Sequence, residues 1–150
     1  MPRFTHYAEA QLSLRSLRSI VAGQPPATAE KSATVLEAAL LMKQQGKGAL
    51  LVVDGSRLIG IFTERDALFR VIAARRDPGS TRLAEVMTPR PHTMPPGKTA
   101  IEALRLMLGC GCRHLPVVEN GTIVGVVSRW DFQGHEQVRL DEETGIWERI

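Results

Sequence analysis

The sequence predicts an α+β protein built from two tandem copies of one β-α-β-β-α unit. Three observations support this: an internal repeat, paired helix-capping signals and two hairpin signals. A shift of 65 residues places 34–66 on 99–131 without a gap, and roughly a third of the aligned residues are identical. Most of the other aligned pairs are conservative. The chain therefore contains a duplication.

In each copy a short extended piece precedes a helix. The extended pieces lie at 27–29 and 92–94, where neighbouring prolines mark their ends. A threonine, with a glutamate three residues later, forms a capping box at each helix start, and a glycine closes each helix. These residues are Thr34, Glu37 and Gly46 in the first copy and Thr99, Glu102 and Gly111 in the second. Apolar residues surround the first helix, so we expect it to be largely buried, including Leu36 and Leu40.

Two apolar runs follow each helix and predict a β-hairpin. The runs are 49–53 and 58–62 in the first copy, and 115–118 and 123–127 in the second. They are separated by turns that contain Asp54-Gly55 and Asn120-Gly121, and such pairs between β-branched runs are the strongest short-range hairpin signal. A second helix is expected to start at Thr63 in one copy and at Ser128 in the other.

The repeat also sets the expected division of the chain. Residues 17–20 loosely resemble 83–86, which predicts a short lead-in helix ahead of each copy. We divide the chain into a lead-in segment (1–24), a first repeat (25–76), a linker (77–90), a second repeat (91–135) and a tail (136–150). The end of the chain is polar, with Ile146, Trp147 and Ile150 as its large apolar anchors near the terminus, so we expect a mobile or docking segment there.

Composition excludes several classes of protein. The 150 residues are 43% hydrophobic and 23% charged, which is typical of a globular chain. The net charge of +3 is too small and too scattered to argue for nucleic-acid binding. No apolar run approaches the roughly 18 residues that span a bilayer, and the start of the chain has no secretory pattern. We therefore expect a soluble, cytoplasmic protein that does not bind a membrane.

The two strand-to-helix junctions carry the chemistry. Thr63 and Asp66 have the same spacing as Ser128 and Asp131, and a hydroxyl followed three residues later by an acid is typical of a helix cap. Aspartate is shorter than glutamate, so we expect it to reach its own backbone less easily and to accept hydrogen bonds from a ribose diol instead. The hydroxyl and the unpaired N–H groups of the helix start would suit a phosphate.

With these junctions the sequence resembles the cystathionine-β-synthase (CBS) domain pair, a tandem module that binds adenosine nucleotides. The resemblance covers about 17–132. It rests on Gly60–Asp66 and Gly125–Asp131, on Val86-Met87-Thr88-Pro89, and on 113–118. It implies that the two repeats pack about a pseudo-twofold axis, that nucleotides bind in the clefts between them, and that the chain forms a homodimer.

The resemblance also assigns roles to residues. The motif aspartate holds the ribose hydroxyls, the hydroxyl residue lies near the phosphates, and the backbone of the extended piece contacts the adenine. The first site would use Ala27, Thr28, Thr63 and Asp66, and the second His92, Thr93, Met94, Ser128 and Asp131. Arg65 could pair with a phosphate; its equivalent is Trp130, and Arg129 lies one residue earlier. Either Arg113 or His114 could also reach a phosphate.

Alternatives exist for each of these residues. Arg65 could be a solvated helix cation, Trp130 could pack against the tail, and Arg113 and His114 could simply lie on a strand surface. Cys110, Cys112 and His114 do not complete a zinc site, so we expect no metal. A reactive thiol has no support from the sequence alone.

No nucleophile elbow, catalytic carboxylate pair or phosphate-binding glycine loop is present, so an enzyme is not expected. The sequence favours a regulatory sensor that binds AMP, ATP or a NAD-like compound and acts on a partner protein that it does not identify. The alternative is a structural, dimerising adaptor whose junctions are only helix caps.

Overall fold

The computed structural model describes residues 14–132, and the chain forms two compact units. The first-repeat unit comprises 25–92, and the hairpin tip 120–123 is grouped with it. The second-repeat unit comprises 93–119 and the chain from 124 onward, together with the segment that ends at residue 24. The lead-in to the first repeat thus belongs to the unit of the second repeat.

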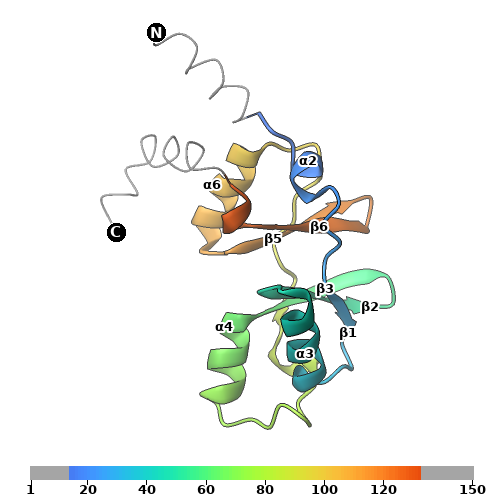
Figure 1. Ribbon diagram of the computed structural model, residues 1–150, viewed down its shortest axis with the longest axis vertical. Helices are drawn as coiled ribbons and strands as arrows, with labels where there is room; N and C mark the ends of the chain where they lie inside the picture. Colours follow the sequence, from blue (N-terminus) through green and yellow to red (C-terminus); the bar gives the residue numbers. More distant parts are fainter. Residues whose placement is uncertain (1–13, 133–150) are drawn as a thin grey trace, which may run out of the picture. The chain divides into compact units, whose positions relative to one another are not determined.

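The first-repeat unit contains a four-stranded sheet in the order β1-β2-β3-β4, and Figure 1 labels its first three strands. Strand β1 runs parallel to β2, and the other neighbours are antiparallel. The strands are β1 (Thr28–Glu30), β2 (Ala49–Asp54), β3 (Arg57–Thr63) and β4 (Thr88–Pro89). The helices are α3 (Val35–Gln45), α4 (Glu64–Asp66), which continues as a π-helix (Ala67–Ile72), and α5 (Leu83–Val86).

The second-repeat unit has the same local order around a two-stranded hairpin. Its elements are α2 (Leu17–Val21), α6 (Ala100–Cys110), β5 (His114–Glu119), β6 (Thr122–Ser128) and a 3₁₀ turn (Arg129–Asp131). The expected extended piece at 92–94 is reduced to one parallel bridge between Met94 and Val117. The α+β class and the two hairpins are confirmed.

The capping signals form as predicted on both long helices. The Thr34 hydroxyl accepts the Glu37 N–H at 3.1 Å, and the Thr34 N–H donates to the Glu37 carboxylate at 3.2 Å. The same reciprocal pair forms between Thr99 and Glu102. A left-handed glycine ends each helix, as φ is 64° at Gly46 and 68° at Gly111, because this conformation is costly for a residue with a Cβ.

The lead-in helices form, and each one completes the core of the other repeat. Leu17, Ile20 and Val21 of α2 are buried in the core of the second-repeat unit, and the Leu17 N–H donates to the Lys98 carbonyl at 2.9 Å. Helix α5 likewise contributes Leu83 and Val86 to the core of the first-repeat unit. The lead-ins are therefore exchanged between the repeats.

The motif glycines, Gly60 and Gly125, allow the lead-in segments to pack closely against β3 and β6. A Cβ on Gly125 would lie 2.6 Å from the Cβ of Val21, inside any real contact distance. A Cβ on Gly60 would meet the Sδ of Met87 and would lie 3.1 Å from the Thr88 carbonyl oxygen. Both glycines therefore serve close packing of the lead-in segment on the strand.

One expectation about burial is wrong. Helix α3 buries Val35, Ala38 and Met42, but Leu36 is 46% exposed and Leu40 is 57% exposed. Only one side of the helix faces the core of its own unit, so the all-round apolar pattern reflects a second, uncovered face. Within 14–132 no helix is long and apolar enough to cross a membrane. The tail with Ile146, Trp147 and Ile150 lies outside the described residues.

Candidate functional site

The first junction joins β3 to α4 through a closed hydrogen-bond network. The Thr63 N–H and hydroxyl both donate to Oδ2 of Asp66, at 3.0 and 3.2 Å, and the Thr63 hydroxyl accepts the Asp66 N–H at 3.2 Å. The Asp66 residue is buried, with 8% of its surface exposed. Thr63 and Asp66 therefore satisfy each other as a capping box.

The other oxygen of Asp66 is also engaged. The Thr88 hydroxyl donates to Oδ1 at 3.5 Å, and Nε of Arg70 lies 3.5 Å from the same atom. Both contacts are long, so each is weaker than a charge-assisted hydrogen bond of ordinary length. Sequence reasoning assigned no site role to Thr88 or Arg70. Thr88 lies in the Val86–Pro89 stretch, one of the motifs on which the family resemblance rests. That motif was the signal that could have pointed to Thr88.

The second junction joins β6 to the 3₁₀ turn, and its network is open. The Ser128 N–H donates to Oδ2 of Asp131 at 2.7 Å, but the reciprocal contact of the Ser128 hydroxyl does not reach hydrogen-bond geometry. Within 14–132 neither that hydroxyl nor Oδ1 of Asp131 has a hydrogen-bond partner. This junction therefore has a hydroxyl and a carboxylate oxygen that no residue of 14–132 engages.

The expectation that aspartate leaves its own backbone free is wrong at both junctions. Each aspartate accepts the backbone N–H of the residue three positions earlier, at 3.0 Å for Asp66 and 2.7 Å for Asp131. The turn brings this N–H close enough for the shorter side chain. What remains for a ligand is the second oxygen, which has partners on Asp66 and, among residues 14–132, none on Asp131.

Backbone contacts hold the second junction in place. The Arg129 N–H donates to the Arg113 carbonyl at 3.1 Å, and a guanidinium nitrogen of Arg15 donates to the Asp131 carbonyl at 3.0 Å. The first junction has an equivalent of the first contact, since the Glu64 N–H donates to the Gly48 carbonyl at 3.1 Å. Sequence reasoning missed Arg15, which precedes the aligned repeat and carries no motif.

The extended pieces use part of their backbone in pairing. The carbonyl of Ala27 accepts the Leu51 N–H at 2.9 Å, and Ala27 is buried while Thr28 is exposed. Met94 is paired on both sides, because its N–H donates to the Pro116 carbonyl and its carbonyl accepts the Val118 N–H. His92 and Thr93 are exposed. Thr28, His92 and Thr93 are thus accessible, whereas both backbone hydrogen-bonding groups of Met94 are already paired within the protein.

The two helix-side residues that distinguish the junctions both point to solvent. Arg65 is exposed, and its guanidinium lies 5.6 Å from the centroid of the Phe69 ring, within range of a cation–π contact. Trp130 is 94% exposed, so it is not a packing residue among the described residues. An exposed indole lies one residue before Asp131 at the second junction, whereas the exposed ring near the first junction, Phe69, is covered on one face by Arg65.

Arg113 lies just before β5, and His114 is the first residue of that strand. Arg113 is exposed, whereas His114 is half-buried at the first position of the strand. The backbone carbonyl of Arg113 accepts the Arg129 N–H, and the Arg113 side chain is the more exposed of the two.

The two cysteines form a disulfide with each other, a pairing that the sequence analysis did not predict. Cys110 is the last residue of α6, and Cys112 follows the glycine that ends the helix. Within residues 14–132 no group of three histidine, cysteine or acidic side chains is arranged to hold a metal ion.

Comparisons with known proteins agree with this geometry. The family model of the CBS domain matches 17–73 and 83–135. The CBS domain-containing protein YhcV of Bacillus subtilis is 38% identical over 106 residues, which cover 71% of this chain and 75% of the relative. A solved protein with CBS domains from Burkholderia ambifaria has 32% identity and a TM-score of 0.73, covering 87% of this chain and 94% of that one.

A CBS domain protein from Pyrobaculum aerophilum, solved in complex with AMP, shares the fold at a TM-score of 0.74. Its identity is 24%, and the match covers 85% of this chain and 98% of that one. The two matched segments coincide with the two repeats and include both junctions. The chain therefore belongs to the CBS domain family and carries two copies of the domain.

Proposed function

We propose that this protein is a regulatory module that binds an adenosine nucleotide, such as AMP, ATP or a NAD-like compound, chiefly through its second junction. One observation carries the proposal: neither Oδ1 of Asp131 nor the Ser128 hydroxyl has a hydrogen-bond partner within the described residues. A ribose diol needs an acceptor of this kind, because its hydroxyls can donate to an ionised carboxylate.

The charged and aromatic groups around this junction suit the rest of a nucleotide. Arg113 is an exposed cation, and a guanidinium binds phosphate oxygens through its planar fork. Trp130 offers an exposed ring on which a base could stack. At the first junction a ribose must displace Thr88 and Arg70 from Asp66, so we expect weaker binding there. The AMP complex of the Pyrobaculum relative supports the choice of ligand class.

Pairs of CBS domains are generally regulatory or signalling modules. A nucleotide can shift such a module only by its difference in affinity between two conformations. We propose that this shift changes how the module engages a partner protein, whose identity the geometry does not specify. No residue of either junction is assigned a catalytic role.

A titration with a matched pair of variants tests the proposal. Asparagine keeps one acceptor for the capping contact but removes the charge, so Asp131→Asn and Asp66→Asn should both fold. We expect Asp131→Asn to weaken AMP binding by about 1.5–3 kcal/mol, roughly 10- to 100-fold. We expect Asp66→Asn to have a smaller effect. Calorimetry of ligand-free protein with AMP, ADP, ATP and NAD measures both.

Two outcomes would contradict the proposal. If none of the four nucleotides binds ligand-free wild-type protein, the module is not a nucleotide sensor. If one binds but Asp131→Asn leaves its affinity unchanged, the free oxygen is not the ribose acceptor. A nucleotide present at 100 times its Kd should also raise the free energy of unfolding by about 2.7 kcal/mol.

A second candidate function, a dimerising adaptor, is favoured by the exposed apolar face of the first-repeat unit. The exposed residues come from α3 and from the π-helix that packs in the same core, and they are Leu36, Leu40, Leu68, Phe69 and Ile72. Such a cluster is typical of a protein interface. We propose that a second copy of this chain covers this face in an isologous dimer.

The second repeat supplies the variant that tests the dimer. Arg105 occupies the position equivalent to Leu40 and is exposed, so Leu40→Arg imports a residue that this helix position tolerates. Leu40→Arg should convert the dimer to a monomer by sedimentation velocity. Leu14→Arg, at a residue 70% exposed in the other unit, should leave the dimer intact. Equal behaviour of the two variants would exclude this face as the interface.

A further inference from the structure

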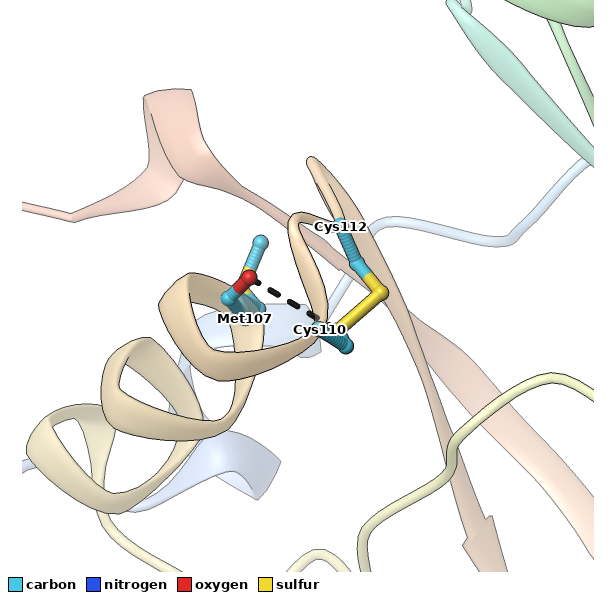
Figure 2. The surroundings of a disulfide bond; sticks show 3 residues. All are labelled: Met107, Cys110 and Cys112. Atoms are coloured by element: carbon cyan, nitrogen blue, oxygen red, sulfur yellow. Dashed lines mark hydrogen bonds between the residues drawn. A yellow bond between two sulfur atoms is a disulfide. The ribbon is translucent and has the colours of Figure 1, made fainter.

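The Cys110–Cys112 disulfide lies at the end of α6, one residue before β5 (Figure 2). It closes a loop with one residue between the cysteines. A disulfide stabilises mainly by constraining the unfolded chain, and the effect is least for the shortest loops. A role as a structural staple is therefore a poor explanation for this pair.

The first repeat shows that the turn does not need the disulfide. Its equivalent residues, Gln45-Gly46-Lys47, make the same turn without cysteines. The Lys47 N–H donates to the Met42 carbonyl at 2.9 Å, and the Cys112 N–H donates to the Met107 carbonyl at 2.9 Å. The backbone hydrogen bond is the same in both copies, so the sulfur chemistry is an addition to a turn that already forms.

The site can also accommodate the reduced pair. Sγ of Cys110 lies 3.6 Å from the Met107 carbonyl oxygen, which can accept the thiol proton once the disulfide is opened (Figure 2). Both cysteines are half-buried, and Gly109, Gly111 and Arg113 around them are exposed, so a small thiol can approach.

The pair is connected to the second junction through one residue. Cys112 is followed by Arg113, whose carbonyl accepts the Arg129 N–H at 3.1 Å. Arg129 lies between Ser128 and Asp131, which present the free hydroxyl and carboxylate oxygen. A constraint on the Cys110–Cys112 turn therefore acts on the carbonyl that positions this junction.

We propose that Cys110 and Cys112 form a reversible redox site that exchanges with cellular thiols and regulates nucleotide binding at the Ser128–Asp131 junction. In the exchange a thiolate attacks one sulfur, which forms a mixed disulfide and releases the other cysteine as a thiolate that takes a proton. A second thiol attacks the mixed disulfide and releases the remaining cysteine. Two thiols are oxidised to one disulfide while the protein disulfide is reduced to two thiols.

The redox part is tested on the native full-length chain. The protein is equilibrated in buffers of reduced and oxidised glutathione, trapped with a maleimide and weighed by mass spectrometry. We expect the number of maleimides bound to change from none to two as the proportion of reduced glutathione rises. Absence of this change would overturn the proposal, as would reduction that occurs only in denaturant.

The coupling to the junction is tested without any nucleotide. We expect the Arg129 amide to lose protection against hydrogen exchange on reduction, because the carbonyl that it contacts is less constrained. Glu64 makes the equivalent contact to Gly48, and the turn before Gly48 has no cysteines. The protection of the Glu64 amide against hydrogen exchange should therefore be the same in both redox states. The double variant Cys110→Ser, Cys112→Ser should match the reduced protein under all conditions. An Arg129 amide that is indifferent to redox state would overturn the coupling.

The nucleotide part rests on the proposed function and is measured separately. We expect reduction to weaken AMP binding about fivefold or more, the lower end of couplings between linked sites. Equal affinity of the oxidised and reduced forms would overturn the regulation. If AMP binds neither form, the proposed function fails, whereas the mass and Arg129 measurements still decide whether the redox site exists and acts on the junction.

Discussion

The two strand-to-helix junctions share a sequence pattern but differ in what they leave open. At Thr63 and Asp66 the hydroxyl and both carboxylate oxygens have partners, whereas at Ser128 and Asp131 one carboxylate oxygen and the hydroxyl have none within 14–132. A duplicated motif can therefore keep its structural function in both copies and remain available to a ligand in one.

The largest expected effect concerns the motif glycines that precede the junctions. Gly125→Ala should lower the free energy of unfolding by about 2–3 kcal/mol, because the new methyl group meets the branched Val21. Gly60→Ala should cost less, about 1 kcal/mol, because the flexible Met87 side chain can move aside. Urea denaturation measures both.

Gly97→Ala is the control for this pair, since nothing lies within 4 Å of the added methyl group. It should change stability by no more than about 0.5 kcal/mol. If Gly60→Ala were the more damaging of the two motif substitutions, the packing of Val21 would not be the tighter contact.

The next prediction compares the stability that the two cap hydroxyls contribute. Thr63→Ala should cost about 1 kcal/mol of stability, as the loss of a helix cap usually does, because it removes both hydrogen bonds of that hydroxyl. Ser128→Ala should cost less than about 0.5 kcal/mol, because its hydroxyl makes no capping hydrogen bond. Thermal unfolding of the two variants and of Thr63→Ser, which keeps the hydroxyl, checks this. Equal losses at both junctions would remove the distinction between them.

A third prediction concerns the removal of a hydrogen bond that competes with a ligand at the first junction. Thr88→Val removes the hydroxyl that donates to Oδ1 of Asp66 at 3.5 Å, so a ligand no longer competes with it. We expect AMP to bind the first junction up to about fivefold more tightly, which corresponds to one weak hydrogen bond of about 1 kcal/mol. The measurement is calorimetry in an Asp131→Asn background, where the second junction contributes little. A weaker affinity would show that Thr88 itself contacts the ligand.

The smallest expected effect is a pH dependence of the caps. The Thr99 backbone N–H lowers the pKa of Glu102 below its ordinary value of 4.5, and the Arg82 backbone N–H, assisted by Arg76, lowers the pKa of Glu85. A pKa that is lower in the folded state stabilises the fold above pH 4.5, and this stabilisation disappears as the pH falls through the folded pKa.

NMR titration of the carboxyl groups should show that both glutamates take up a proton at a lower pH than an unperturbed glutamate does. Glu102→Gln keeps an oxygen acceptor for the cap and should flatten the loss of stability of the second-repeat unit in acid. A variant with the acid profile of the wild-type protein would show that this cap does not contribute to it.

Much of the fold could be predicted because its signals are local. Thr34 with Glu37, and Asn120 with Gly121, fix a helix start and a hairpin turn through contacts between residues near in sequence. The exchange of α2 and α5 could not be predicted, because the sequence of a short apolar helix does not specify which core the helix packs into. The exposure of Leu40 was missed for a related reason: periodicity shows that a face is apolar but not what covers it.

The residue types at the two candidate junctions can be read from the sequence, but the contacts of their side chains cannot. The sequence placed a hydroxyl and an acid at each junction, but the difference between Asp66 and Asp131 depends on Thr88 and Arg70, which are distant in the chain or belong to no motif. The Cys110–Cys112 pairing depends on the turn at the end of α6, and a Cys-x-Cys pattern alone does not distinguish a disulfide from two packed thiols.

The exchanged lead-in helices have a consequence for the order in which the chain folds during synthesis. The buried core of the first-repeat unit draws its residues from 27–86, one continuous stretch, so it can be completed while the ribosome is still translating the rest. Helix α2 is made earlier but packs against residues from 94 onward. Helix α2 must therefore wait, with its apolar side uncovered, until β6 has been made.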